Sequence, residues 1–117
     1  MVVDNDVSFR RALTRLLVTV GFSVDAFESA EEFLELRREV PECLVLDVRL
    51  GGMSGFDLHE RLSLEGPVPP TIFIAARDDD ATREHARRVS SAQYLPKPLD
   101  DAVLIGAIDQ VTGQRRR

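Results

Sequence analysis

The sequence predicts an α/β fold in which five parallel β-strands form a central sheet between two layers of helices. Short apolar segments alternate with segments of helical hydrophobic spacing along the whole chain, which is the pattern of right-handed βαβ units. Some of the short segments are apolar at every position, as expected of strands covered on both faces. The chain has 117 residues, which suits a single domain of ordinary size.

Five β-prone apolar segments are predicted to be strands, because each is short and bounded by polar residues, glycine, proline or a helical pattern. They are residues 1–3, 22–27, 43–46, 71–74 and 93–95. The third is a continuous apolar run that leads directly into Asp47. We therefore place Asp47 at or just past the carboxyl end of that strand.

Five helices are predicted in the segments that follow the strands. The first is expected to bury one face, made of Phe9, Ala12, Leu13, Leu16, Leu17 and Val20. Its N-cap is expected among the polar residues 4–6 and its stop at Gly21. A Ser29–Glu32 capping box should begin the second helix.

The remaining three helices are predicted from weaker signals. They are expected near residues 56–64, near residues 81–89 after the acidic run 78–80, and after the acidic pair 100–101. The last should present an apolar face made of Val103, Leu104, Ala107, Ile108 and Val111. His59 and His85 fall on predicted helices and are expected to be ordinary surface residues.

Composition narrows the functional class. The formal net charge is −5 and the pI is about 5.0, so the overall field disfavours direct nucleic-acid binding. Cys43 is the single cysteine, which excludes an intramolecular disulfide, agrees with a reducing cytoplasm and is expected to be a buried thiol. No stretch approaches the roughly 20 apolar residues of a membrane span. These observations predict a cytoplasmic protein without a membrane segment.

Acidic residues and the only lysine are predicted to converge at one edge of the sheet. In an open parallel sheet, sites form outside the carboxyl ends of the strands. The first strand brings residues 4–6 there, the third brings Asp47, the fourth brings Ala75 and the fifth brings Lys97. Clustered oxygen ligands of this kind suit Mg²⁺, and a lysine can hold a phosphate oxygen. The combination predicts phosphoryl transfer onto the Asp47 carboxylate.

Three blocks of the sequence resemble those of response-regulator receiver domains, in the same order and spacing. Residues 2–6 (VVDND) resemble the acidic opening of that family. Residues 44–50 (LVLDVRL), with Gly55 eight residues after Asp47, resemble its phosphoacceptor block. Residues 94–99 (YLPKPL) resemble its Lys-Pro block. The chain is most similar to regulators that carry a C-terminal helix-turn-helix output domain.

The resemblance implies a flavodoxin-like, doubly wound, three-layer fold with strand order 2-1-3-4-5 and five helices. Residues 1–112 would be the receiver domain and residues 113–117 a linker stub or tail. The partner would be a sensor histidine kinase or a phosphotransfer protein, with a DNA-binding output domain beyond this chain. Dimerisation through the fourth helix, fifth strand and fifth helix is a further hypothesis. Such a domain signals, and catalyses at most its own phosphorylation.

Residue by residue, the resemblance assigns Asp47 as the phosphoacceptor and Lys97 as its phosphoryl contact. Asp4, the Asp47 carboxylate and the Arg49 backbone carbonyl would hold Mg²⁺, with Asn5 as a doubtful ligand. Tyr94 would be the aromatic residue of the conformational switch. The resemblance also makes the Lys97–Pro98 peptide bond a candidate cis bond. Asp6 is interpreted as a helix cap.

Three positions depart from the family pattern. Asn5 replaces the second acid, so metal affinity is expected to fall because an amide adds no charge. Ala75 replaces the Ser or Thr whose hydroxyl bonds the phosphoryl group. Gly51 replaces a proline and should loosen the loop after Asp47. We therefore expect a receiver with weakened metal binding and switching.

Two other functions remain as alternatives at this point. The first is a phosphate-independent pseudo-receiver that acts only as an interaction module. The second, remote, is a phosphatase of the haloacid-dehalogenase type, which also uses a strand-end aspartate. That chemistry needs a second acid two residues later, where this chain has Arg49.

Overall fold

A computed structural model describes residues 1–37, 40–76, 79–89 and 92–113 of the chain. The five strands form one parallel sheet in the order β2-β1-β3-β4-β5. They are β1 (Val2–Val3), β2 (Ala26–Phe27), β3 (Leu44–Asp47), β4 (Thr71–Ala75) and β5 (Ala92–Pro96). The predicted fold class and strand order are confirmed.

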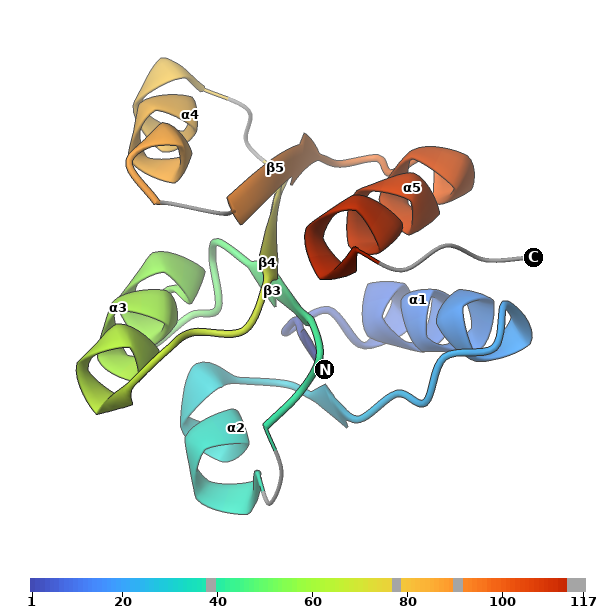
Figure 1. Cartoon of the computed structure of the whole chain (residues 1–117), viewed down its shortest axis with the longest axis horizontal. Helices are drawn as coiled ribbons and strands as arrows, with labels where there is room; N and C mark the ends of the chain where they lie inside the picture. The colour runs from blue at the N-terminus through green and yellow to red at the C-terminus, as the bar shows by residue number, and fades with distance from the viewer. Residues whose placement is uncertain (38–39, 77–78, 90–91, 114–117) are drawn as a thin grey trace.

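Helices cover both faces of the sheet, as Figure 1 shows in a view along the strands. Helices α1 and α5 lie against one face, and α2, α3 and α4 lie against the other. Their bounds are α1 (Val7–Thr19), α2 (Ala30–Leu36), α3 (Gly55–Glu65), α4 (Asp80–Arg87) and α5 (Asp101–Thr112). The arrangement is the three-layer architecture that the alternating pattern predicts.

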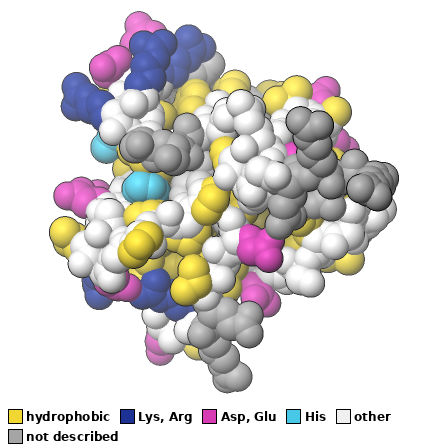
Figure 2. Space-filling model, in the orientation of Figure 1, with side chains coloured by type: hydrophobic (Ala, Val, Ile, Leu, Met, Phe, Trp, Pro, Cys, Tyr) yellow, Lys and Arg dark blue, Asp and Glu magenta, His cyan; other side chains and the backbone are white. Residues whose placement is uncertain are grey.

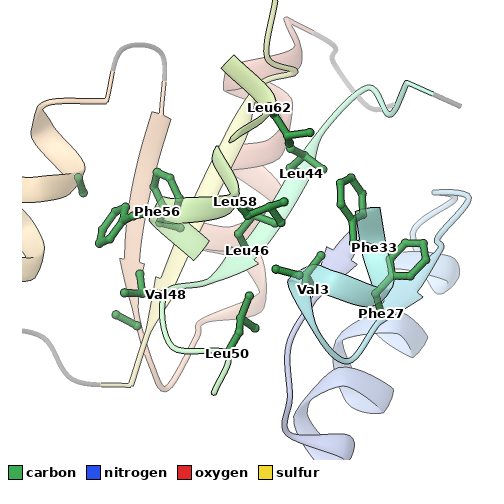
Figure 3. Packing of buried hydrophobic residues seen from close by; sticks show 14 residues of the cluster. Val3, Phe27, Phe33, Leu44, Leu46, Val48, Leu50, Phe56, Leu58 and Leu62 are labelled. Carbon is green, nitrogen blue, oxygen red and sulfur yellow. The ribbon is translucent and has the colours of Figure 1, made fainter. Parts of the chain in front are cut away.

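Two hydrophobic clusters sit on either side of the sheet because neighbouring residues of a strand point to opposite faces. On β3, Leu44 and Leu46 pack toward α2 and α3, whereas Val45 packs toward α1 and α5. Figure 3 shows the first cluster, in which Phe33 and Phe56 close over the strand residues. All four residues of β3 are buried, which explains its uninterrupted apolar sequence up to Asp47.

Helix caps fix where several elements begin. The Asp6 carboxylate accepts a hydrogen bond from the Phe9 N–H, so Asp6 is the cap, as interpreted. Ser29 caps α2 by accepting from the Glu32 N–H. The complete reciprocal capping box occurs instead at the start of α3, between Ser54 and Asp57.

Some predicted boundaries and faces were wrong. The second strand is limited to Ala26–Phe27 because its partner β1 provides only two paired positions. On α1, Ala12 is exposed, and on α5 Val103 is 53% exposed; each lies at the edge of its apolar stripe rather than in the core. Residue 78 of the predicted acidic run, and the tail from residue 114, lie outside the described residues.

The two histidines have different surroundings. His85 is exposed but its ring stacks on Phe56, with centroids 3.9 Å apart. His59 is half-buried near Phe73, and burial lowers the pKa of its imidazole. Figure 2 shows both rings in the region between α3 and α4, below the basic side chains of α4. Only His85 therefore fits the expected surface role.

Cys43 and the described helices can be set against the predictions of a buried thiol and of a chain without a membrane segment. Cys43 is only partly buried rather than fully buried, and burial raises the pKa of its thiol to about 11. The thiol is therefore protonated at neutral pH and poorly nucleophilic. Among the described helices, none has the length and apolar character needed to cross a membrane.

Candidate functional site

The register of the sheet brings the predicted site residues to one edge. Asp47 is the last residue of β3 and pairs with Ile74 of β4, while Ala75 pairs with Pro96 of β5. Asp4 follows β1 and Lys97 follows β5. Parallel strands present their carboxyl ends on the same side. Four strands that are far apart in sequence thus end at one rim.

The Lys97 ammonium lies between two carboxylates at this rim. Its Nζ donates to Asp4 Oδ2 at 3.0 Å and to Asp47 Oδ2 at 3.2 Å. Asp4 is 1% exposed and Asp47 is 5% exposed, so these ion pairs are shielded from solvent. The convergence of Asp4, Asp47 and Lys97 predicted from the sequence is therefore confirmed as geometry.

Backbone hydrogen bonds hold both carboxylates. Asp4 Oδ1 accepts from the Asp6 N–H at 2.8 Å, and Asp47 Oδ1 accepts from the Arg49 N–H at 3.1 Å. Each carboxylate therefore uses one oxygen for the backbone and the other for Lys97. The carboxylates are fixed before any ligand arrives, which lowers the cost of organising the site.

The electrostatics of the rim are unbalanced. Burial, with the neighbouring charge of Asp4, raises the pKa of Asp47 to about 6, although the Arg49 N–H and Lys97 oppose this shift. Burial lowers the pKa of Lys97, but its hydrogen bonds and charge interactions with Asp4 and Asp47 outweigh burial and leave it raised. One cation thus lies between two anions, and burial disfavours the ionised form of Asp47.

The peptide bond after Lys97 is cis, as the resemblance implied. The Lys97 N–H donates to the Ala75 carbonyl oxygen at 2.8 Å. This bond extends the pairing of β4 and β5 and places the start of the Lys97 side chain at the rim. Ala75 itself is 3% exposed, and its methyl group offers no hydrogen-bond donor to the site.

The departures from the family pattern differ in their surroundings. Asn5 is exposed, whereas the adjacent Asp4 is buried. Gly51 has a φ of 88°, which a proline cannot adopt because its ring fixes φ near −65°. The loop after Asp47 therefore follows a path that excludes the usual proline. Tyr94 is half-buried on β5 and packs against the cluster beneath α2 to α4.

Three further contacts of the site were not found from the sequence. Arg10 donates from its guanidinium to the Asp4 carbonyl oxygen at 2.6 Å. Glu31 of α2 accepts from the Met53 N–H at 3.1 Å and so ties α2 to the loop after Asp47. The Phe9 ring faces the Lys97 ammonium, with Nζ 4.0 Å from the ring centroid. Each of the three contacts joins residues of different structural elements, so no local sequence motif indicates it.

The close approach of Gly55 explains the fixed spacing of the phosphoacceptor block. A Cβ at Gly55 would overlap the Asp47 carbonyl oxygen, and the Gly55 N–H donates to the Val48 carbonyl at 3.0 Å. The start of α3 therefore presses directly on the backbone that carries Asp47. A glycine eight residues after the aspartate is needed for this contact.

The two carboxylates of the rim are oxygen ligands of the type that can hold Mg²⁺. Two buried carboxylates with little compensating charge form an oxygen-rich site of the type that a hard cation prefers. Among the described residues, however, no group of three or more His, Cys, Asp or Glu side chains is arranged to hold a metal. Asp4 and Asp47 therefore fit the cation, but as a site with two protein carboxylates rather than three.

A doubly wound α/β domain whose strand ends gather two buried aspartates and a lysine has the architecture of a phosphoacceptor signalling domain. The sequence profile of the response regulator receiver domain matches residues 1–109. The chain belongs to the response regulator receiver domain family. Receiver domains belong to two-component systems, act with histidine kinases, generally use Mg²⁺ in phosphorylation, and are not enzymes in the ordinary sense.

Named relatives agree with this assignment. Nodulation protein W of Bradyrhizobium diazoefficiens is 39% identical over 117 residues, covering 99% of this chain and 52% of that protein. Response regulator protein TodT of Pseudomonas putida is 35% identical over 108 residues, covering 92% and 48%. The chain thus spans about half the length of these curated relatives.

Solved structures give the same result. A response regulator receiver protein from Burkholderia phymatum has 38% sequence identity and a TM-score of 0.84, covering 98% of this chain and 94% of that one. The response regulator StyR has 41% identity and a TM-score of 0.86, covering 96% of this chain and 57% of that one.

Gly55→Ala is expected to destabilise the domain by about 2–4 kcal/mol, because the added methyl group must displace the Asp47 backbone. Urea unfolding with unchanged m-value would measure the loss. Gly106→Ala is the matched control, because a Cβ at that helical position meets open space and alanine favours a helix. Equal stability of Gly55→Ala and wild type would contradict the close-approach argument.

Asp47→Asn is expected to stabilise the metal-free domain by roughly 1–3 kcal/mol at pH 7.5, because the ionised carboxylate is disfavoured by burial. The folded state takes up the Asp47 proton near pH 6, before the unfolded state does near 3.8. The destabilising effect of Asp47 is therefore full above about pH 6 and disappears as the pH falls toward 3.8. Thermal unfolding of both proteins in a chelator from pH 4 to 8 measures this stability difference. A difference that grows toward acid pH would contradict the predicted pH dependence.

Proposed function

We propose that this receiver domain accepts a phosphoryl group on Asp47 from a sensor histidine kinase or a phosphotransfer protein. The observation that carries the proposal is the position of the Lys97 ammonium between Asp4 and Asp47, 3.0 and 3.2 Å from their oxygens. A phosphoryl group on Asp47 would bring its oxygens to a cation that is already in place. Family membership supports the same role.

In the proposed transfer, an Asp47 carboxylate oxygen attacks the phosphorus of a phosphohistidine. The new bond is the carboxylate O–P bond, and the bond that breaks is the P–N bond to the imidazole, which leaves with the electron pair and takes up a proton. Asp47 is ionised above its pKa of about 6, so it is available as the nucleophile at neutral pH. Lys97 stabilises negative charge on the phosphoryl oxygens.

Mg²⁺ would be held by Asp4, the Asp47 carboxylate and the Arg49 backbone carbonyl, and when bound it neutralises charge on the phosphoryl oxygens. We propose that this site is weak, because Asn5 adds no charge. Asp6 does not replace the missing acid, since its carboxylate is engaged in capping α1. A compact domain of residues 1–112 followed by a tail fits this role.

The switch is proposed to be weakened as well. A receiver responds because the phosphoryl group favours one of two conformations. Ala75 lacks the hydroxyl that would bond that group, and Tyr94 would be left as the reporting aromatic residue. One lost hydrogen bond to a charged group removes roughly 1.5–3 kcal/mol of bias, or about tenfold or more in the population ratio.

Further partners of this chain are proposed from its relatives. These relatives include DNA-binding transcriptional regulators such as NtrC of Klebsiella pneumoniae, which is 34% identical over 110 residues. We propose that a DNA-binding output domain is joined to this receiver beyond residues 113–117, and that α4, β5 and α5 form a dimer face. Scattering with and without a phosphate mimic tests the dimer.

The phosphoacceptor assignment predicts an added phosphoryl mass when the protein is incubated with acetyl phosphate and Mg²⁺. Asp47→Ala should abolish the adduct, because it removes the attacking oxygen. Asp6→Asn is the control, since asparagine retains the cap and removes only a neighbouring charge. Intact mass spectrometry reads the result. Absence of an adduct on wild type would favour the pseudo-receiver alternative, and an adduct on Asp47→Ala would place the acceptor elsewhere.

Ala75→Thr is predicted to strengthen switching about tenfold or more, because the added hydroxyl can bond the phosphoryl group. The measurement is the population of the active conformation from NMR chemical shifts with beryllofluoride, a phosphoryl mimic. Ala75→Val provides the same shape without the hydroxyl. If Val and Thr shift the population equally, the hydroxyl is not the cause.

A further inference from the structure

Phe9 occupies a defined place in the first turn of α1. Its backbone N–H donates to the Asp6 carboxylate, so its position relative to the helix start is fixed. Its ring is half-buried and packs with the cluster under α1 and α5. From there the ring faces the site, with the Lys97 Nζ 4.0 Å from its centroid. This distance is well within the range of a cation–π interaction.

Four residues form a closed circuit of contacts around the ammonium. Asp4 Oδ1 accepts from the Asp6 N–H, and the Asp6 carboxylate accepts from the Phe9 N–H. The Phe9 ring faces Lys97, whose Nζ returns to Asp4 Oδ2. The same short segment therefore supplies both an anion and an aromatic face for the lysine. Placement of the ring is coupled to placement of the Asp4 carboxylate.

We propose that Phe9 is a positioning residue for Lys97, holding its ammonium at the rim from the side not occupied by Asp4 and Asp47. The ammonium has three N–H donors, and two of its contacts are the carboxylates. The ring covers a further side, and the Lys97 side chain is only 18% exposed. Lysine has a flexible four-carbon stem, so a packed aromatic face restricts the positions that its end can reach.

The functional consequence rests on the proposed phosphorylation of Asp47. When an Asp47 oxygen becomes part of the acyl phosphate, the charge of that carboxylate changes and its bond to Lys97 must be rearranged. Asp4 and the Phe9 ring then remain to keep the ammonium beside the phosphoryl oxygens. Loss of the aromatic face should therefore slow phosphorylation by about three- to thirtyfold, the effect expected of a partly desolvated cation–π contact.

The contact can be observed directly because Lys97 is the only lysine in the chain. Protein grown with ¹³C-lysine gives a single set of side-chain signals, and the Lys97 methylene protons next to Nζ should be shifted upfield by the Phe9 ring current. Phe9→Leu should abolish this shift, and Phe9→Tyr should retain it. A wild-type signal at the ordinary lysine position would overturn the proposal.

The kinetic test uses acetyl phosphate and Mg²⁺ on the same proteins. Phe9→Leu is expected to lower the maximal phosphorylation rate at saturating Mg²⁺, whereas Phe9→Tyr should stay within about twofold of wild type. Leu16→Ala is the control, because Leu16 lines the same groove beside α1 as Phe9. The substitution removes apolar packing but no aromatic contact to Lys97. Circular dichroism establishes that each variant is folded.

The outcomes separate this inference from the proposed function. A normal rate for Phe9→Leu, or an equal loss in Leu16→Ala, overturns the positioning role while leaving Asp47 as the acceptor. If wild type takes up no phosphoryl group, the proposed function fails, and the ring-current shift alone decides whether Phe9 holds Lys97. Loss of both the shift and the rate in Phe9→Leu, with both retained in Phe9→Tyr, supports the proposal.

Discussion

The pairing of one ammonium with two buried carboxylates is the constraint on which the rim depends. Lys97 meets Asp4 and Asp47 from the end of a different strand, so the sheet must keep its register for the three charges to meet. A buried ion pair stabilises little beyond the cost of desolvating its charges. Its contribution here is geometric, because it holds the Asp47 carboxylate beside the Lys97 ammonium, where the proposed phosphoryl transfer would take place.

The charge balance of the rim explains why the missing groups matter. One cation faces two acids, and burial already raises the pKa of Asp47 to about 6. A carboxylate at position 5 would raise the affinity of the rim for a divalent cation, and Asn5 adds no such charge. Ala75 lacks the hydroxyl that would bond a phosphoryl group on Asp47. Under the proposed function, these two departures would weaken metal affinity and phosphate readout separately, while Asp47 and Lys97 are both present.

Much of the fold and the rim could be predicted because periodicity and strand-end chemistry are local. The continuous apolar run before Asp47 indicates a buried strand, and all four residues of β3 are buried. The predictions failed where contacts with distant segments determine the length of an element or the partner of a side chain. The second strand is short because β1 offers only two pairs, and Glu31 reaches Met53 across 22 positions. No single segment contains the information for such contacts.

The stability of the metal-free fold and the proposed phosphorylation both involve the charge of Asp47. Burial and the charge of Asp4 raise the pKa of Asp47, so its ionised form is expected to destabilise the metal-free fold. A cation that binds beside this charge in the folded state, and not in the unfolded state, would stabilise the fold. Mg²⁺ at the rim would offset this negative charge, whereas a phosphoryl group on Asp47 would add negative charge that Lys97 and Mg²⁺ would have to balance. The rim has one cation beside two acids, so we expect a second cation bound there to stabilise the folded domain.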